Sequence, residues 1–274
     1  MAGYVLKRKP TRKPLKPVFD STHPAVRKAD HLLSFDRVDE NGAPWDEAQK
    51  AFWATNTTNG TTPYKKQSVS GSMQLARQDI DEAGIAYQAP ATGLNPNNVP
   101  VFVIVGFTVL QAPSASWRGI ISLGNLLRDS SGCWNITSNG TTEFQSWIGG
   151  SRFLAPIEVG KKHFIIYRYD GVDQHQQYNS ALGYWQTLTQ AASNGTTSDS
   201  LWLGTAYTGE LPVAFDFLVS SVGSAPSIAT CESLVKNPYQ VFKPKAQYID
   251  ISVAAGGFQA AWARNANQII GMNQ

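Results

Sequence analysis

Short apolar segments recur along most of this chain, rich in β-branched and aromatic residues and separated by Gly, Asn and Pro. Such segments, bounded by turn residues, predict strands. Within Phe164–Tyr169 apolar and polar residues alternate, which predicts one buried and one exposed face. Ala48–Trp53, inside a polar stretch, is instead predicted to form a short helical turn. The predicted strands cover residues 32–35, 73–80, 85–88, 99–110, 118–123, 133–137, 143–148, 163–169, 184–189, 200–203, 213–222 and 248–253.

One helix is predicted, late in the chain. Pro226 and Ser227 suit its first positions, and apolar residues then recur at helical spacing as far as Val235. The helix should end at Asn237, because proline disfavours helical geometry in the residue before it. Many short strands and one helix predict an all-β fold, a two-sheet antiparallel jelly-roll sandwich with one short helix in its C-terminal half.

Composition narrows the protein class. The 274 residues are 42% hydrophobic and 16% charged, which suits a folded domain with a sizeable core and argues against global disorder. The longest apolar run, residues 99–110, is shorter than the roughly 20 residues of a membrane helix. Two cysteines, Cys133 and Cys231, cannot build a disulfide framework. We therefore expect no membrane span and place Cys231 on the buried face of the helix.

The charge is distributed unevenly. The chain carries +3 overall, yet residues 1–16 contain six basic residues and no acidic one, so the remainder carries −3. Pro10, Pro14 and Pro17 forbid a regular helix there. We expect residues 1–19 to form an extended arm that docks on an acidic surface of a partner protein. A nucleic-acid tail is the competing interpretation, disfavoured because aromatic residues that would stack bases are missing. The expected partner-binding residues are Lys7, Arg8, Lys9, Arg12, Lys13 and Lys16.

Several segments resemble, in order, the concanavalin A-like (laminin G-like) jelly-roll superfamily, and in particular its variants in tailed-phage virion proteins. The resemblance covers roughly residues 20–245. It implies that this range is the jelly-roll domain, with 1–19 as an arm and 246–274 as a C-terminal strand or tail that pairs with a neighbouring subunit or with its own chain. The segments that carry it are His23-Pro24-Ala25 before Leu32–Phe35, Gly160–Gly171 ending in Tyr-Asp-Gly, Leu201–Gly204, Val213–Val219, and the helix with Asn237–Pro244.

Some members of the superfamily are glucanases with alternating acidic residues on one strand. Here Asp216 and Asp250 stand alone, without the second carboxylate that retaining chemistry places about 5–5.5 Å away, so we expect no enzyme. No His or Cys spacing suggests zinc, and no cofactor is expected. The resemblance also implies a calcium ion at the rim, for which Asp170, Asp173 and Asp199 are candidate ligands. We favour the interpretation that these aspartates stabilise turns.

The leading functional hypothesis is a non-enzymatic structural component of a tailed-phage virion. It is expected to be a capsid decoration or accessory protein, anchored by the arm to the major capsid protein or to tail or portal components, and homo-oligomeric. The alternative is a tail- or fibre-associated module that binds a cell-surface glycan, with a glycoside hydrolase as the third hypothesis. Trp117, Trp147 and Trp185 are the candidate glycan-stacking residues, although tryptophans in a sandwich mostly fill its core.

Overall fold

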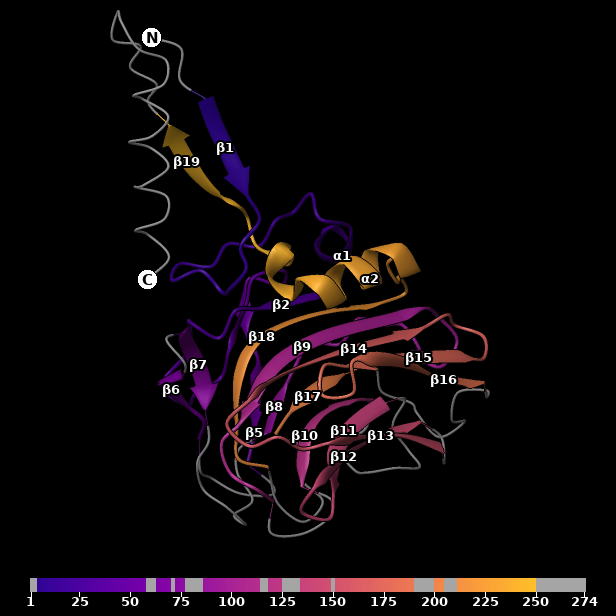
Figure 1. The fold of residues 1–274 in the computed structure, drawn as a ribbon. Helices are drawn as coiled ribbons and strands as arrows, with labels where there is room; N and C mark the ends of the chain where they lie inside the picture. The colour runs from indigo at the N-terminus through magenta and orange to yellow at the C-terminus, as the bar shows by residue number, and fades with distance from the viewer. Residues whose placement is uncertain are drawn as a thin grey trace, which may run out of the picture.

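The structure is a computed structural model that describes residues 4–57, 63–69, 72–76, 86–113, 118–124, 134–148, 151–189, 200–204 and 211–249. Two antiparallel β-sheets pack face to face (Figure 1), as predicted for a jelly-roll sandwich. Among the described residues no helix is long and apolar enough to cross a membrane.

The seven-stranded sheet has the strand order β13-β12-β11-β10-β17-β8-β5. Its hairpin between β11 and β12 turns at Asn139-Gly140, where Gly140 takes a positive φ of 69°. The strands are β5 (Ala54–Asn56), β8 (Ala86–Gln88), β10 (Gly119–Leu123), β11 (Trp134–Asn139), β12 (Glu143–Ile148), β13 (Ser151–Pro156) and β17 (Leu201–Leu203).

The eight-stranded sheet has the order β16-β15-β14-β9-β18-β7-β6, and β2 also pairs with β18. The predicted boundaries of β16 and β18 coincide with the observed ones. The strands are β2 (His31–Leu33), β6 (Lys65–Val69), β7 (Ser72–Ala76), β9 (Val101–Val109), β14 (Lys162–Tyr169), β15 (Gln174–Asn179), β16 (Tyr184–Thr189) and β18 (Val213–Val222).

Both faces of the central strands β9 and β18 of the eight-stranded sheet are buried. Alternate residues of β9, such as Val103 and Val105, belong to the core between the sheets, whereas Phe102 and Ile104 belong to a second apolar cluster on the outer face. Here the prediction of one exposed face for residues 164–169 is wrong: Ile166 is fully buried, in that outer cluster. The outer cluster exists because other segments cover the sheet.

A helix and the N-terminal segment provide this cover. Helix α2 (Ile228–Lys236) begins after Ser227, whose hydroxyl accepts a bond from the Thr230 amide, and ends at Asn237, as predicted. Its Cys231 is 1% exposed, on the buried face as expected. A 3₁₀ turn, η1 (Pro238–Val241), follows, and the one-turn helix α1 (Pro24–Arg27) begins after His23, whose Nδ1 accepts from the Ala25 amide.

The N-terminal arm differs from the expectation. Residues 9–20 lie against their own chain: Asn237 donates to the Pro10 carbonyl (2.9 Å), and the Lys243 and Asp20 amides bond to Val18 and Val241 carbonyls (2.7 Å each). The arm was expected to dock on a partner protein; residues 9–20 instead contact their own chain, where α2 and η1 supply a complementary surface.

The two ends of the described chain form a separate two-stranded ribbon. Strand β1 (Tyr4–Arg8) pairs antiparallel with β19 (Lys245–Ile249), and the ribbon projects from the body beyond α2 (Figure 1). The C-terminal strand thus pairs with its own chain, which was one of the two arrangements expected. The predicted strand 248–253 begins three residues earlier than expected, and residues 250–253 lie outside the described part.

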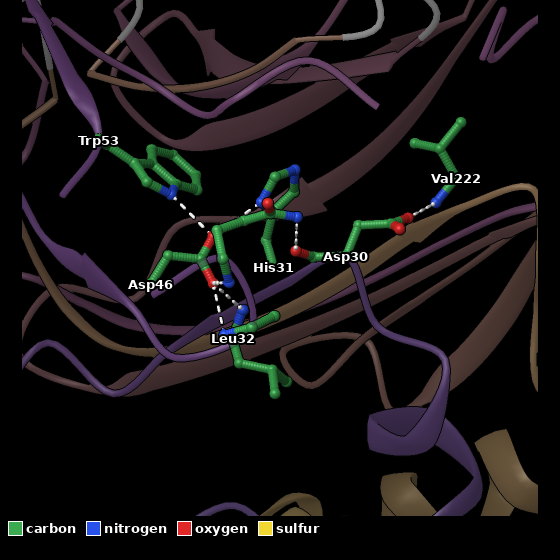
Figure 2. A network of polar contacts seen from close by, with 8 residues as sticks. Asp30, His31, Leu32, Asp46, Trp53 and Val222 are labelled. Atoms are coloured by element: carbon green, nitrogen blue, oxygen red, sulfur yellow. Dashed lines mark hydrogen bonds and ion pairs between the residues drawn. The ribbon is translucent and has the colours of Figure 1, made fainter. Parts of the chain in front are cut away.

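A buried carboxylate fixes the segment that precedes the sandwich strands. Strands β3 (Trp45–Asp46) and β4 (Ala51–Phe52) form a small hairpin where a helical turn was predicted. Asp46 is fully buried; the His31 Nδ1 lies 2.8 Å and the Trp53 Nε1 3.0 Å from its Oδ2, while its Oδ1 accepts from backbone amides (Figure 2). Burial alone would raise the pKa of Asp46, but these hydrogen bonds and the charge of His31 lower it. The amides are those of Leu32, Ala48 and Gln49.

Gly106 on β9 offers a test of the outer cluster. A methyl group there would lie 3.0 Å from ring carbons of Phe164 and Phe217. We expect Gly106→Ala to lower the free energy of unfolding by about 1–3 kcal/mol through overpacking, measured by urea titration. The same change in a Phe217→Leu background should be less destabilising, because the smaller side chain makes room. Equal losses in both backgrounds would contradict this explanation.

Candidate functional site

The outer face of the seven-stranded sheet carries a continuous row of polar and aromatic residues. Their neighbours along each strand, such as Trp134, Ile136, Phe144 and Leu203, point into the core between the sheets. Directly opposed positions on adjacent strands place the outward residues side by side from β8 to β13. In order they are Gln88, Trp202, Ser122, Asn135, Trp147 and Arg152.

Several polar atoms in this layer are buried with unused hydrogen-bonding capacity. Within the described part of the chain, the Asn135 Oδ1, the Thr137 Oγ1 and the Trp202 Nε1 are buried and have no hydrogen-bond partner. A buried polar group without a partner is unfavourable by about 1–3 kcal/mol, so clusters of them call for an explanation. They lie in one layer, which identifies this face as a candidate binding surface.

The row becomes accessible at its β12–β13 end. Arg152 is exposed and Trp147 half-buried, and the Arg152 guanidinium carbon lies 5.6 Å from the centre of the Trp147 ring. Arg152 also donates to the Gln145 Oε1 (3.1 Å), and Gln145 in turn donates to the Ser138 carbonyl (3.0 Å). An indole face beside an oriented guanidinium and amide groups can bind a flat or ring-shaped polar ligand with negative charge.

The predicted glycan-stacking tryptophans are not brought together. Trp147 lies on the outer face of the seven-stranded sheet, whereas Trp185 is on β16, the edge of the other sheet. There it packs beside Tyr178, with ring centres 5.7 Å apart, against the outer cluster. Trp117 lies outside the described residues.

The six predicted partner-binding residues also divide into groups. Lys7 and Arg8 belong to the ribbon strand β1, and Arg12 and Lys16 are exposed. Lys9 bonds to the Gln240 Oε1 of its own chain (3.0 Å), and Lys13 is only 5% exposed. Lys13 is thus enclosed by its own chain, which corrects the expectation that its ammonium faces a partner.

Lys13 is part of a buried charge cluster around Asp216. Lys162 (2.8 Å) and the Tyr239 hydroxyl (2.6 Å) donate to the Asp216 Oδ2, and the Lys13 Nζ lies 3.9 Å from Oδ1. Burial lowers the pKa of Lys13 to about 8, although the charges of Asp216 and Asp36 favour its protonated form. Burial and the charge of Asp216 raise the pKa of Tyr239. The cluster attaches the arm to β14, β18 and η1.

The remaining candidate carboxylates have local structural contacts. Asp170 Oδ1 accepts three backbone amides of its own hairpin turn, from Val172, Asp173 and Gln174, at 2.8–3.1 Å. This arrangement is the turn stabilisation favoured above. Asp199 and Asp250 lie outside the described residues. Within the described part, no group of three or more His, Cys, Asp or Glu side chains could hold a metal ion.

Sequence reasoning did not find the polar outer row. Asn135, Thr137 and Gln145 alternate with core residues along β11 and β12, but their grouping depends on strand register, which spans residues far apart in sequence. Arg152 lies on β13, a strand that was not predicted. The Asp216 cluster was missed for the same reason, because Lys13 and Asp216 are joined only by the fold.

No protein-family model and no curated protein sequence matches this chain. Among solved structures it is similar to the Trypanosoma rangeli sialidase in complex with the inhibitor DANA, with a TM-score of 0.54 and 10% identity over 77% of this chain and 33% of the sialidase. It is also similar to the binding domain of botulinum neurotoxin DC in complex with rat synaptotagmin II, with a TM-score of 0.52 and 7% identity over 77% of this chain and 51% of that one. The binding domain of botulinum neurotoxin serotype G gives a TM-score of 0.52 and 11% identity, covering 76% and 50%.

The chain therefore spans about a third of the sialidase and half of the toxin domains. At these identities the likeness shows the fold alone: a jelly-roll-like β-sandwich of the lectin-like kind. This agrees with the superfamily resemblance at the level of the fold.

Substitutions of Lys13 and Asp216 test how the arm is attached to the body. We expect Lys13→Met to change the unfolding free energy at pH 7 by less than about 1 kcal/mol, because Asp216 keeps Lys162 and Tyr239. Asp216→Asn should lower it by about 3 kcal/mol or more, since two ammonium groups would lose their buried counter-charge. Urea titration followed by tryptophan fluorescence measures both. A larger loss for the lysine variant would contradict the central role of Asp216.

The wild type and Lys13→Met also test how the unfolding free energy depends on pH. The pKa of Lys13 is about 8 in the folded protein and 10.5 in its ordinary state, so between these values the unfolded chain binds more protons. Rising pH should therefore stabilise the wild type relative to Lys13→Met, by on the order of 2 kcal/mol between pH 7 and pH 10. A difference that stays constant over this range would show that Lys13 titrates normally.

Proposed function

We propose that this chain is a non-enzymatic structural component of a tailed-phage virion, a capsid decoration or accessory protein. The β1–β19 ribbon is its anchor, and the sandwich is the displayed body. The observation that carries the proposal is that the ribbon and the seven-stranded sheet lie on opposite sides of the molecule. The ribbon leaves the body on the α2 side, and the seven-stranded sheet lies on the opposite side (Figure 1). A module attached through the ribbon thus presents that sheet away from its support.

The attachment of the ribbon to the body supports an anchoring role. At its base Lys9 bonds to Gln240, Asn237 to the Pro10 carbonyl, and the Lys243 amide to the Val18 carbonyl. Below these contacts lies the buried Lys13–Asp216 pair. A ribbon held at several points can transmit load to the sandwich. The resemblance of the closing segment Asn237–Pro244 to phage variants of the fold supplies the virion context.

The partners of the buried carboxylates support the non-enzymatic part of the proposal. Asp46 is surrounded by hydrogen-bond donors from five residues, and Asp216 by two ammonium groups and a phenol. Each arrangement holds the carboxylate in a fixed place with its donors, whereas a glycosidase acid must hold and release a proton.

A glycan-binding module is the second candidate, favoured by the outer row of the seven-stranded sheet. Trp147 offers an aromatic face, Arg152 a cation, and Gln145 and Asn135 amide groups. This set suits an anionic sugar ring, bound through stacking and charge-assisted hydrogen bonds. The similar structures include a sialidase bound to sialic acid, which fits this chemistry. The two candidates are compatible, because the row lies on the side away from the ribbon.

Deleting residues 1–8 tests the anchor. We expect the shortened chain to keep its melting temperature within a few degrees, since residues 9–20 still cover the eight-stranded sheet, and to be absent from particles purified by density gradient. The full chain should co-purify with particles in fixed stoichiometry. A chain with Lys65→Glu and Lys66→Glu, both exposed on β6, is the control and should be incorporated normally. Full incorporation of the deleted chain would exclude anchoring by the ribbon.

Substitutions on the outer row test glycan binding. On an array of neutral and acidic glycans we expect preference for acidic ones, and Trp147→Ala or Arg152→Ala should weaken the dissociation constant at least about tenfold. Trp185→Ala, on the other sheet, is the matched control and should bind normally. Binding lost in Trp185→Ala but kept in Trp147→Ala would move the site to the opposite face, and an array without any signal would remove this candidate.

A further inference from the structure

The β1–β19 ribbon has two open edges. Its register pairs Tyr4 with Ile249 and Arg8 with Lys245, so all five residues of each strand are matched. In the described part of the chain, neither strand has a second neighbour, and the ribbon stands clear of both sheets (Figure 1). Each edge therefore offers a row of backbone N–H and C=O groups to a further strand.

An isolated two-stranded ribbon is only marginally stable in water. Among the described residues, no further strand or helix packs along it, and its contacts with the body lie at its base. A third strand would add main-chain hydrogen bonds on the open edge and bring the ribbon to the size at which sheets become stable. The topology thus leaves a place for one extended segment.

The charges of the ribbon define the chemistry of that segment. Arg8 and Lys245 are directly opposite each other, and Lys7, Lys9 and Lys243 lie beside them along the two strands. No acidic residue occurs in 4–9 or 243–249. Like charges at directly opposed positions destabilise a strand pair. A segment that stabilises this ribbon must therefore bring carboxylates.

We propose that the ribbon binds an acidic, extended segment of another protein by strand addition. This rests on the proposed function, in which the ribbon is the anchor, and it specifies the partner. A second copy of the ribbon would bring the same cations together and is disfavoured by charge. A nucleic acid would neutralise the cations, but its phosphates do not match the alternating donors and acceptors of a strand edge.

The test uses the full chain and three labelled probes of similar charge. They are a ten-residue peptide of alternating Glu and Val, one of alternating Glu and Pro, and a short DNA duplex. We expect fluorescence anisotropy to show that the Glu–Val peptide binds at least tenfold more tightly than the Glu–Pro peptide, because proline lacks the N–H that a strand donates. Amide hydrogen exchange should slow in residues 4–8 and 245–249 when the Glu–Val peptide is bound.

Three variants locate the binding. Arg8→Glu with Lys245→Glu should weaken the Glu–Val peptide at least tenfold, whereas Lys65→Glu with Lys66→Glu should change its affinity less than twofold. Leu6→Pro keeps every charge but removes a main-chain donor from β1, and it should also weaken binding. Melting temperatures establish that each variant is folded.

Three results would overturn the proposal: equal affinity for both peptides, tighter binding of the DNA duplex, or no peptide binding. The outcome is separable from that of the particle experiment. If the Glu–Val peptide binds the ribbon but the chain without residues 1–8 still enters particles, strand addition stands and the anchoring function fails. If the deleted chain is excluded from particles but no peptide binds, the anchor stands and this mode of attachment fails.

Discussion

The central strands of the eight-stranded sheet are apolar on both faces, and much of the rest of the structure follows from covering the second face. Strands β9 and β18 are buried along their whole length, with Phe102, Ile104, Phe217 and Val219 on the side away from the other sheet. Water on that side would remove the hydrophobic stabilisation of two central strands. Helix α2, the turn η1 and residues 9–20 cover it, so both ends of the domain run to the same side of the molecule. The ribbon is formed where these two ends meet.

Sequence patterns predict the sandwich well because most strands present apolar residues to a core. The boundaries of β12, β16, β18 and α2 follow from alternation, β-branched runs, the Ser227 cap and Pro238. The failures have physical causes. Strand β15 was missed because its buried positions are polar: His175 pairs with the Tyr167 hydroxyl and Gln177 with the Trp134 indole. The outer polar row and the Asp216 cluster were missed because they unite residues from distant strands, which no local pattern reports.

The buried carboxylates join separate segments of the chain in this fold. Asp46 and Asp216 lie where segments without regular structure meet the sheets, and each draws donors from several elements. A single carboxylate satisfied in this way gives direction to contacts that apolar packing alone leaves unspecified. The basic residues of the N-terminal segment therefore divide into two groups: Lys13 pairs with Asp216 inside the protein, whereas Lys7 and Arg8 belong to the ribbon strand β1. The net charge of the segment conceals this division.

The joining of the first and last described strands has a consequence for biosynthesis. Residues 4–20 leave the ribosome well before the surfaces that receive them, because η1 and β19 are made more than 200 residues later. At about 5–20 residues per second the N-terminal segment waits on the order of ten to forty seconds without its binding surface. Closure of the domain therefore has to wait for the synthesis of β19, and the cationic N-terminal segment stays accessible to chaperones and proteases until then. A chain released before α2 and η1 are made would leave an uncovered, aggregation-prone sheet.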